Sequence, residues 1–325
     1  MKELYIAVDS GKSATKAVIR IDDDIKKIIF RTKVKEISEL GIDITPNSYK
    51  IEFQGKSFLI GDMVSESSCN YQITKNTIDH KICIYTAICK MIEITKAMSY
   101  GLPKIHLSLN INLNIYKNST LKNEYQCFMQ NNNEIVSIKV NDIAYAFRIC
   151  SILILPEAIG PLYIRTNDFR SKKATVIDIG SLNISYCTFN KLIPALDSMN
   201  VSNSGINVLR SKIAETLTST YGVLVNDDDV EEVLQNEYLY VSGIRKTESK
   251  EIIEKLIVKH VSEIFNYGRS RGITFNNSNL IFVGGGSILL KNFILTEYPL
   301  AIFENDPQFT NCLSFLNVLE VKNAK

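Results

Sequence analysis

The sequence predicts an α/β protein whose two domains face each other across a cleft. In each of two segments that lie far apart in the chain, a buried strand delivers an aspartate to a turn of small residues and a second strand follows. In a third segment, near the end of the chain, a strand runs into three consecutive glycines and then an apolar helix. The chain has 325 residues, which suits two domains because roughly 100–200 residues is the usual domain size.

The first segment begins almost at the start of the chain. An apolar strand, 4–8, ends at Asp9, and a second strand, 17–21, follows a short polar turn. Backbone N–H groups in such a turn can close around phosphate oxygens, and the aspartate can hold Mg²⁺ through its bound waters. Alone, this pattern is most often only a hairpin. The residues predicted to bind phosphate here are Asp9, Ser10, Gly11 and Lys12, with Lys12 equally interpretable as a solvated turn residue.

The second segment repeats this arrangement. Strand 174–177 leads to Asp178, and strand 184–189 returns after the turn. The repetition suggests a duplicated architecture with one phosphate-binding hairpin in each half. The predicted ligands are Asp178, Gly180, Ser181 and Asn183.

The third segment combines a strand, 280–283, with a glycine turn and a helix over 288–294. Glycines let the backbone approach a flat ligand closely. The predicted contacts are Gly284, Gly285, Gly286 and Ser287, although Ser287 is also a good N-cap for the helix. Three such elements in this order indicate a nucleotide site.

These segments resemble those of the superfamily of actins, sugar kinases and heat-shock chaperones, in which two hairpins bind the phosphates and a glycine turn borders the adenosine. Within it, the chain is similar to the ParM family of plasmid-segregating bacterial actins and their actin-like relatives. Further segments carry this similarity: 100–109, 152–161, 203–208 and 305–311. One departure is Gly180-Ser181-Leu182, where the family often has Gly-Gly-Thr, because Leu182 removes a polar contact.

The resemblance implies an actin-like fold, a duplicated ribonuclease H-like architecture around a nucleotide cleft. The first domain is expected over 1–165, with a C-terminal helix, 306–325, returning to it, and the second over 166–305. Periodicity predicts further elements: helices over 78–98, 205–221 and 248–271, strands over 135–149, and a helix start in the acidic run 227–232. Residues 31–66 are interpreted as an insertion in the first domain.

The resemblance also implies roles for individual residues. Asp9 and Asp178 are the expected magnesium ligands, acting through bound water. The alternative is that each aspartate only caps its turn. Glu157 is the candidate for orienting or deprotonating water; the alternative is a first-turn helix glutamate that follows Pro156 at N1. Gly205, which opens a helix, is expected to lie near the nucleotide.

Composition limits the partners and the compartment. The formal net charge is only +2, which argues against direct nucleic-acid binding. No apolar run reaches the ~18 residues of a membrane span, strand-like sequence follows Met1 at once, and no leading amphipathic helix is present to bind a membrane. The 7 cysteines are scattered, without the spacing of a zinc site or a disulfide framework. A reducing cytoplasm is therefore expected.

The predicted function is that of an ATPase, with ATP or GTP and Mg²⁺ as cofactors. It is expected to polymerise head to tail on binding ATP, to disassemble after hydrolysis, and to segregate plasmid DNA through a DNA-binding adaptor on a centromere-like plasmid site. The alternative is a small-molecule kinase of the same superfamily. A chaperone or cell-shape role ranks lower, because no substrate-binding domain or membrane-binding helix is evident.

Overall fold

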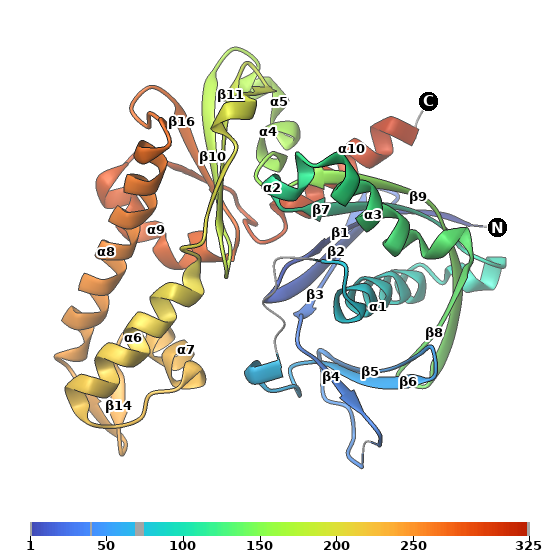
Figure 1. Ribbon diagram of the computed structural model, residues 1–325, viewed down its shortest axis with the longest axis horizontal. Coiled ribbons are helices and arrows are strands. Elements are labelled where there is room, and N and C mark those ends of the chain that lie inside the picture. Colours follow the sequence, from blue (N-terminus) through green and yellow to red (C-terminus); the bar gives the residue numbers. More distant parts are fainter. Residues whose placement is uncertain (1, 40, 69–74, 324–325) are drawn as a thin grey trace. The chain divides into compact units, whose positions relative to one another are not determined.

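The computed structural model describes residues 2–39, 41–68 and 75–323. The chain forms two compact units (Figure 1). The first comprises Met1–Thr166 and Phe309–Lys325, and the second comprises Asn167–Gln308.

The first unit is built on a nine-stranded sheet with the order β3-β2-β1-β7-β9-β8-β5-β6-β4. β1 pairs with β7, and β7 with β9, in parallel, whereas the other neighbours in this order are antiparallel. The predicted hairpin and the strands over 135–149 are confirmed. The strands are β1 (Glu3–Ser10), β2 (Ala14–Ile21), β3 (Asp24–Arg31), β4 (Val34–Ile37), β5 (Ser48–Phe53), β6 (Lys56–Gly61), β7 (Lys104–Ile111), β8 (Ile135–Val140) and β9 (Ile143–Pro156).

The segment 31–66, interpreted from the sequence as an insertion, forms part of this sheet. β4, β5 and β6 form one end of the nine-stranded order, and β5 pairs with β8. Their alternating apolar side chains, such as Ile51 and Phe58, are buried in the same core as those of β1 and β7. The segment therefore helps to build the fold rather than decorating it.

Helices cover both faces of the first sheet. Ile6 and Val8 of β1 pack in one core with α1 (Ile78–Ile94). Because alternate residues of a strand point to opposite faces, Ala7 points away from that core, and α10 (Thr310–Asn323) packs on this other face. α1 ends four residues before the predicted end, and Lys96 soon after it has a left-handed backbone. The other helices are α2 (Leu113–Tyr116), α3 (Ser119–Gln130) and α4 (Gly160–Ile164); α5 (Thr166–Phe169) spans the sequence boundary of the units.

The second unit has a six-stranded sheet with the order β12-β11-β10-β16-β17, and β13 also pairs with β11. β10, β16 and β17 are parallel, and β10 and β11 form the predicted second hairpin. The strands are β10 (Lys173–Ile179), β11 (Ile184–Asn190), β12 (Ile193–Pro194), β13 (Asn200–Ser202), β16 (Asn279–Val283) and β17 (Ile302–Phe303), with a separate pair of β14 (Leu239–Val241) and β15 (Ile244–Lys246).

The predicted helices of this unit are confirmed as α6 (Ile206–Tyr221), α7 (Asp227–Asn236) and α8 (Ser249–Ser270), and α9 (Gly285–Glu297) follows the glycine turn. α7 starts in a capping box, because Asn226 accepts from the N–H of Asp229 while the Asp229 side chain accepts from the N–H of Asn226. α6, α8 and α9 pack together over an apolar core.

Substitution of Phe265 in α8 tests whether this second core stabilises the unit. Its fully buried ring lies 5.0 Å from that of Phe275 and 4.3 Å from that of Tyr298, measured between centroids. We expect Phe265→Ala to lower the free energy of unfolding by about 3–5 kcal/mol, because it leaves a cavity. Val258→Ala on the same helix, where the side chain is 53% exposed, should change it by less than about 0.5 kcal/mol. Urea unfolding followed by far-UV circular dichroism measures both, and equal losses would contradict this core assignment.

Candidate functional site

The candidate site of the first unit lies at the carboxyl edge of three neighbouring parallel strands. Asp9 is near the end of β1, Asn110 is near the end of β7, and Glu157 directly follows β9. The pairing brings them to one level, because Val8 lies opposite Leu109 and Ile111 opposite Pro156. Ligands of α/β proteins commonly bind at this edge of a parallel sheet.

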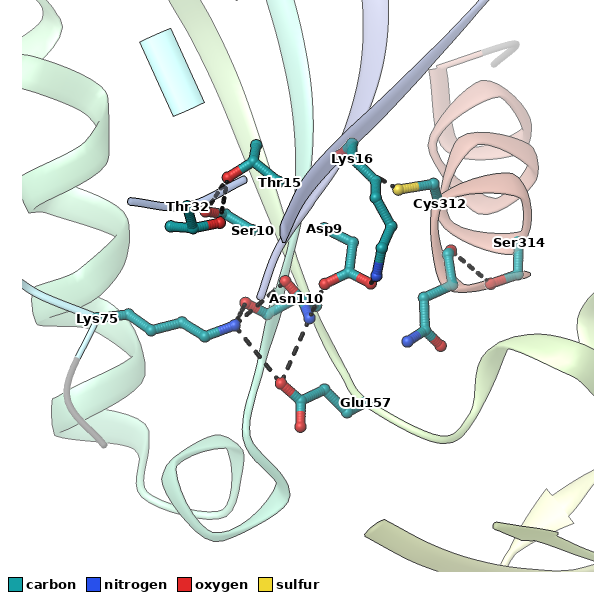
Figure 2. A network of polar contacts seen from close by, with 11 residues as sticks. Asp9, Ser10, Thr15, Lys16, Thr32, Lys75, Asn110, Glu157, Cys312 and Ser314 are labelled. Carbon is teal, nitrogen blue, oxygen red and sulfur yellow. Dashed lines mark hydrogen bonds and ion pairs between the residues drawn. The ribbon is translucent and has the colours of Figure 1, made fainter. Parts of the chain in front are cut away.

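The amide of Asn110 joins the two carboxylates (Figure 2). Its Nδ2 donates to Asp9 Oδ1 at 2.7 Å and to Glu157 Oε1 at 3.3 Å. Lys75 Nζ lies 3.3 Å from Asn110 Oδ1 and 3.5 Å from Glu157 Oε1, and Lys16 Nζ lies 3.6 Å from Asp9 Oδ2. Two carboxylates are thus balanced by two ammonium groups, at distances longer than those of strong charge-assisted hydrogen bonds.

Glu157 lies in a turn between β9 and α4. Its N–H donates to Ile111 O at 3.1 Å, so the backbone of β7 fixes its position. Pro156 ends the strand, and α4 begins only at Gly160. The alternative that Glu157 is a first-turn helix residue after a proline at N1 is therefore wrong.

The first hairpin turn has an inward-facing serine. Ser10 Oγ is buried, 2.9 Å from Thr15 Oγ1 and 3.3 Å from His80 Nδ1, and the Thr15 hydroxyl continues to Thr32 at 2.9 Å. The hydroxyl of Ser10 is thus used inside the unit. Gly11 N–H closes the turn on Ala14 O at 3.0 Å. A phosphate contact from Ser10 or Gly11 stays a prediction.

Lys12 is half-buried rather than fully solvated. Burial of its ammonium and, second, the nearby charge of Lys75 lower the pKa of Lys12 to about 8, while the charge of Asp79 partly opposes both. The same two lysines contribute, after burial, to holding the pKa of His80 well below its usual value. Lys12 and Lys75 therefore lie close enough beside the first turn to influence each other, and Asp79 partly offsets their charge.

In the second unit, the hairpin turn and the start of α6 are joined through the backbone. The N–H groups of Ile206 and Asn207 donate to the carbonyls of Gly180 and Ser181 at 3.0 and 2.9 Å. A Cβ on Gly205 would lie 2.3 Å from Ser181 O, so this position needs glycine for packing. The turn is further closed by a hydrogen bond from Gly180 N–H to Asn183 O at 3.0 Å.

The glycine turn approaches Asp178. Asp178 pairs with Val283 across β10 and β16, and Gly284 follows with a φ of +83°. A Cβ on Gly284 would lie 2.4 Å from Asp178 Oδ1. A Cβ on Gly286 would lie equally close to the side chain of Ile179. Both glycines are therefore required by the local packing of this unit.

The suggestion that Ser287 caps α9 is wrong. α9 begins at Gly285 with Gly284 as its N-cap, and Ser287 lies in the first turn. Its buried hydroxyl donates to Gly284 O at 2.8 Å. Two of the three glycines are therefore helical, which moves the cap position three residues toward the N-terminus.

Within each unit the structure brings several predicted residues together. In the first unit, Asp9 and Glu157 both accept hydrogen bonds from the amide of Asn110. In the second unit, Asp178 lies beside Gly284 of the glycine turn, and Gly205 lies against the hairpin turn. Sequence reasoning missed Asn110 and the two lysines beside it. For Asn110, a usable signal is an amide at the end of a predicted apolar strand. Lys75 and Lys16 carry no comparable signal in the sequence.

The carboxylate oxygens at this edge fit a Mg²⁺ ion that is bound mainly through water and phosphate. Magnesium prefers oxygen ligands and keeps several waters, usually taking only one or two carboxylates from the protein. At this edge, Asp9 can supply such an oxygen. Among residues 2–39, 41–68 and 75–323, no group of three or more histidine, cysteine, aspartate or glutamate side chains is placed to enclose a metal ion.

Comparison with known proteins agrees with this architecture. Residues 7–160 match the family model described as the actin-like proteins N-terminal domain. A filament structure of Alp12 is 29% identical and covers 99% of both chains, with a TM-score of 0.73. The archaeal actin homolog Ta0583 is 18% identical, and the match covers 98% of this chain and 99% of the Ta0583 chain with a TM-score of 0.80. Ta0583 was also solved in complex with ADP. The subunit of a 15-stranded ParM filament from Clostridium botulinum is 18% identical, and the match covers 99% of this chain and 100% of that chain with a TM-score of 0.76.

The fold and the paired hairpins therefore define an actin-like fold. The predicted resemblance to the ParM and Alp bacterial actins is confirmed along the whole chain. No curated protein sequence matches the chain. In the part of the chain that the structure describes, no helix has the length and apolar character needed to cross a membrane.

Asn110→Asp tests the carboxylate pair. It should lower the free energy of unfolding by about 1–3 kcal/mol at pH 8, because a third carboxylate replaces the donor between Asp9 and Glu157, only partly offset by Lys75. Repulsion raises the pKa of the new carboxyl in the folded state. The folded variant then takes up its proton before the unfolded chain does, so the loss shrinks as the pH falls toward 5.

Urea unfolding at pH 8 and pH 5 measures this change. The matched control is Asn141→Asp, because exposed Asn141 accepts from the N–H of Lys50 at 2.9 Å and a carboxylate can accept the same bond. The control should be nearly neutral at both pH values. A loss for Asn110→Asp that is equal at the two pH values would contradict the repulsion between carboxylates.

Proposed function

We propose that the chain hydrolyses ATP and forms head-to-tail filaments that disassemble after hydrolysis. We further propose that these filaments segregate plasmid DNA through a DNA-binding adaptor protein. The observation that carries the proposal is the Asp9–Asn110–Glu157 cluster at the carboxyl edge of β1, β7 and β9. Such a cluster can orient water beside a bound phosphate, and its elements match the actin-like proteins.

In the proposed mechanism, Glu157 orients the attacking water and accepts its proton. Asn110 holds the Glu157 carboxylate through Oε1 and the Asp9 carboxylate through Oδ1. Asp9 and Asp178 are each proposed as water-mediated ligands of Mg²⁺. When bound, this ion neutralises the charge of the phosphate oxygens. Phosphoryl transfer depends mainly on positioning and electrostatics, and fixed side chains of this kind supply both.

Assembly and nucleotide identity are supported by different relatives. Alp12, 29% identical over nearly the whole chain, has a filament structure. A head-to-tail contact that does not close produces an open filament. We assign ATP rather than GTP by analogy with Ta0583, which was solved with ADP. An adaptor is proposed because a net charge of +2 gives the chain little attraction for DNA of its own.

Glu157→Ala should slow ATP hydrolysis by about 10²–10⁴-fold, because it removes the group that orients the water. With ATP and magnesium, wild-type protein should scatter light and pellet, and the polymer should then decay. The variant's polymer should persist. Glu134→Ala, which removes an exposed glutamate at the end of a short 3₁₀ turn, should behave like the wild type.

Two outcomes would contradict this proposal. Nucleotide binding without polymer at any protein concentration would remove the filament function and favour a small-molecule kinase. Hydrolysis in Glu157→Ala within threefold of the wild-type rate would remove Glu157 from the mechanism. A steep rise of hydrolysis above a critical protein concentration, without any added acceptor, would support the filament.

The lowered pKa of Lys12 predicts pH-dependent nucleotide affinity. If Lys12 contacts a phosphate, the bound anion raises this pKa from about 8, so binding takes up a proton. Affinity should then fall as the pH rises through 8, by up to about tenfold between pH 7 and 9.

Titration with a fluorescent ATP analogue at several pH values measures this effect. Lys12→Met should bind more weakly at pH 7, and its affinity should not change over this range. An equal decline in Lys12→Met and the wild type would place the titrating group elsewhere.

A further inference from the structure

Lys75 is a buried cation that the proposed mechanism does not yet use. Its side chain is only 6% exposed. Nζ faces three acceptors: Asn110 O at 3.5 Å, Asn110 Oδ1 at 3.3 Å and Glu157 Oε1 at 3.5 Å (Figure 2). An ammonium group has three donors and no acceptor, so this set matches its bonding capacity.

Stability alone explains this placement poorly. Removing an ammonium from water is costly, and only short, well-aligned contacts repay that cost. Charge-assisted N–H···O contacts are typically about 2.7–2.9 Å, and those of Lys75 are longer. The lysine also adds repulsion, because its charge lowers the pKa of Lys12. A buried cation with these properties is better explained by what it positions.

Lys75 and the carboxylates together fix the orientation of the Asn110 amide. A lysine can only donate, so Oδ1 of Asn110 must face it. Nδ2 must then face Asp9 and Glu157, which can only accept when ionised. Lys75 therefore acts on Glu157 in two ways, directly at Oε1 and through the amide that contacts the same oxygen.

We propose that Lys75 is a positioning residue for hydrolysis, which holds Asn110 and Glu157 in the orientation that aligns the attacking water. The inference rests on the proposed ATPase function. Lys75→Met should lower kcat by about 10–100-fold, because displacements of about 1 Å in a catalytic group have effects of this size. KM should stay within about threefold of wild type, because the lysine acts on the water-orienting group rather than on the nucleotide.

The decisive measurement is a double-mutant cycle with Glu157→Gln. If Lys75 acts through Glu157, adding Lys75→Met to Glu157→Gln should change kcat by less than about threefold. A purely structural role would lower kcat by the same factor in both backgrounds. Lys33→Met is the matched control, because the side chain of Lys33 is 11% exposed and pairs with Glu66 at 3.9 Å rather than with the residues of the cluster.

Lys75→Arg covers the case in which the methionine variant does not fold, as judged by circular dichroism and nucleotide binding. It keeps the charge and the donors and should retain kcat within about tenfold of wild type. The proposal is overturned if wild type hydrolyses ATP and folded Lys75→Met has a kcat within threefold of it. It is also overturned if Lys75→Met raises KM without lowering kcat. The same holds if Lys75→Met lowers kcat by the same factor in the wild type and in Glu157→Gln. Absence of hydrolysis in the wild type would instead overturn the proposed function itself.

Discussion

The parallel pairing of β1, β7 and β9 is the constraint on which the first unit's candidate site depends. It sets Asp9, Asn110 and Glu157 at one edge, although they are far apart in the chain. Side chains alternate along a strand, so a slip of one residue in β7 would turn Asn110 to the other face. The apolar residues of β7 hold this register, because Leu107 and Leu109 fill the core on one side.

In the second unit, the candidate residues are brought together mainly by close approach of the backbone rather than by hydrogen bonds between side chains. Its parallel pair, β10 and β16, brings Asp178 beside Gly284, where a side chain would collide with the carboxylate. Gly205 allows an equally close approach of α6 to the hairpin turn. The carbonyls of that turn already accept from the first N–H groups of α6. The N–H groups of Ile206 and Asn207 are therefore already used within the unit.

Local patterns predicted the parts of this architecture that depend on local chemistry. Both hairpins, the glycine turn and the long helices follow from apolar runs, small turn residues and helical periodicity. The features that the sequence did not predict share a physical cause, because each depends on contacts with residues that are distant in the sequence. β5 connects β4 and β6 to the sheet by pairing with β8, which lies far along the chain, and Lys75 reaches the cluster from the segment before α1. The start of α9 was not predicted because glycines are weak helix formers, yet Gly285 and Gly286 are helical and Gly286 packs closely against Ile179.

The distribution of charge gives the first unit a polar character that suits its proposed ligand. Asp9 and Glu157 present carboxylates at the edge of β1 and β9, whereas Lys12 and Lys75 repel each other beside the first hairpin turn. The carboxylates can accept hydrogen bonds from water, including the waters around a cation that accompanies a bound phosphate. The cost of keeping these charges partly buried is thus consistent with a site selected for binding and hydrolysis rather than for stability.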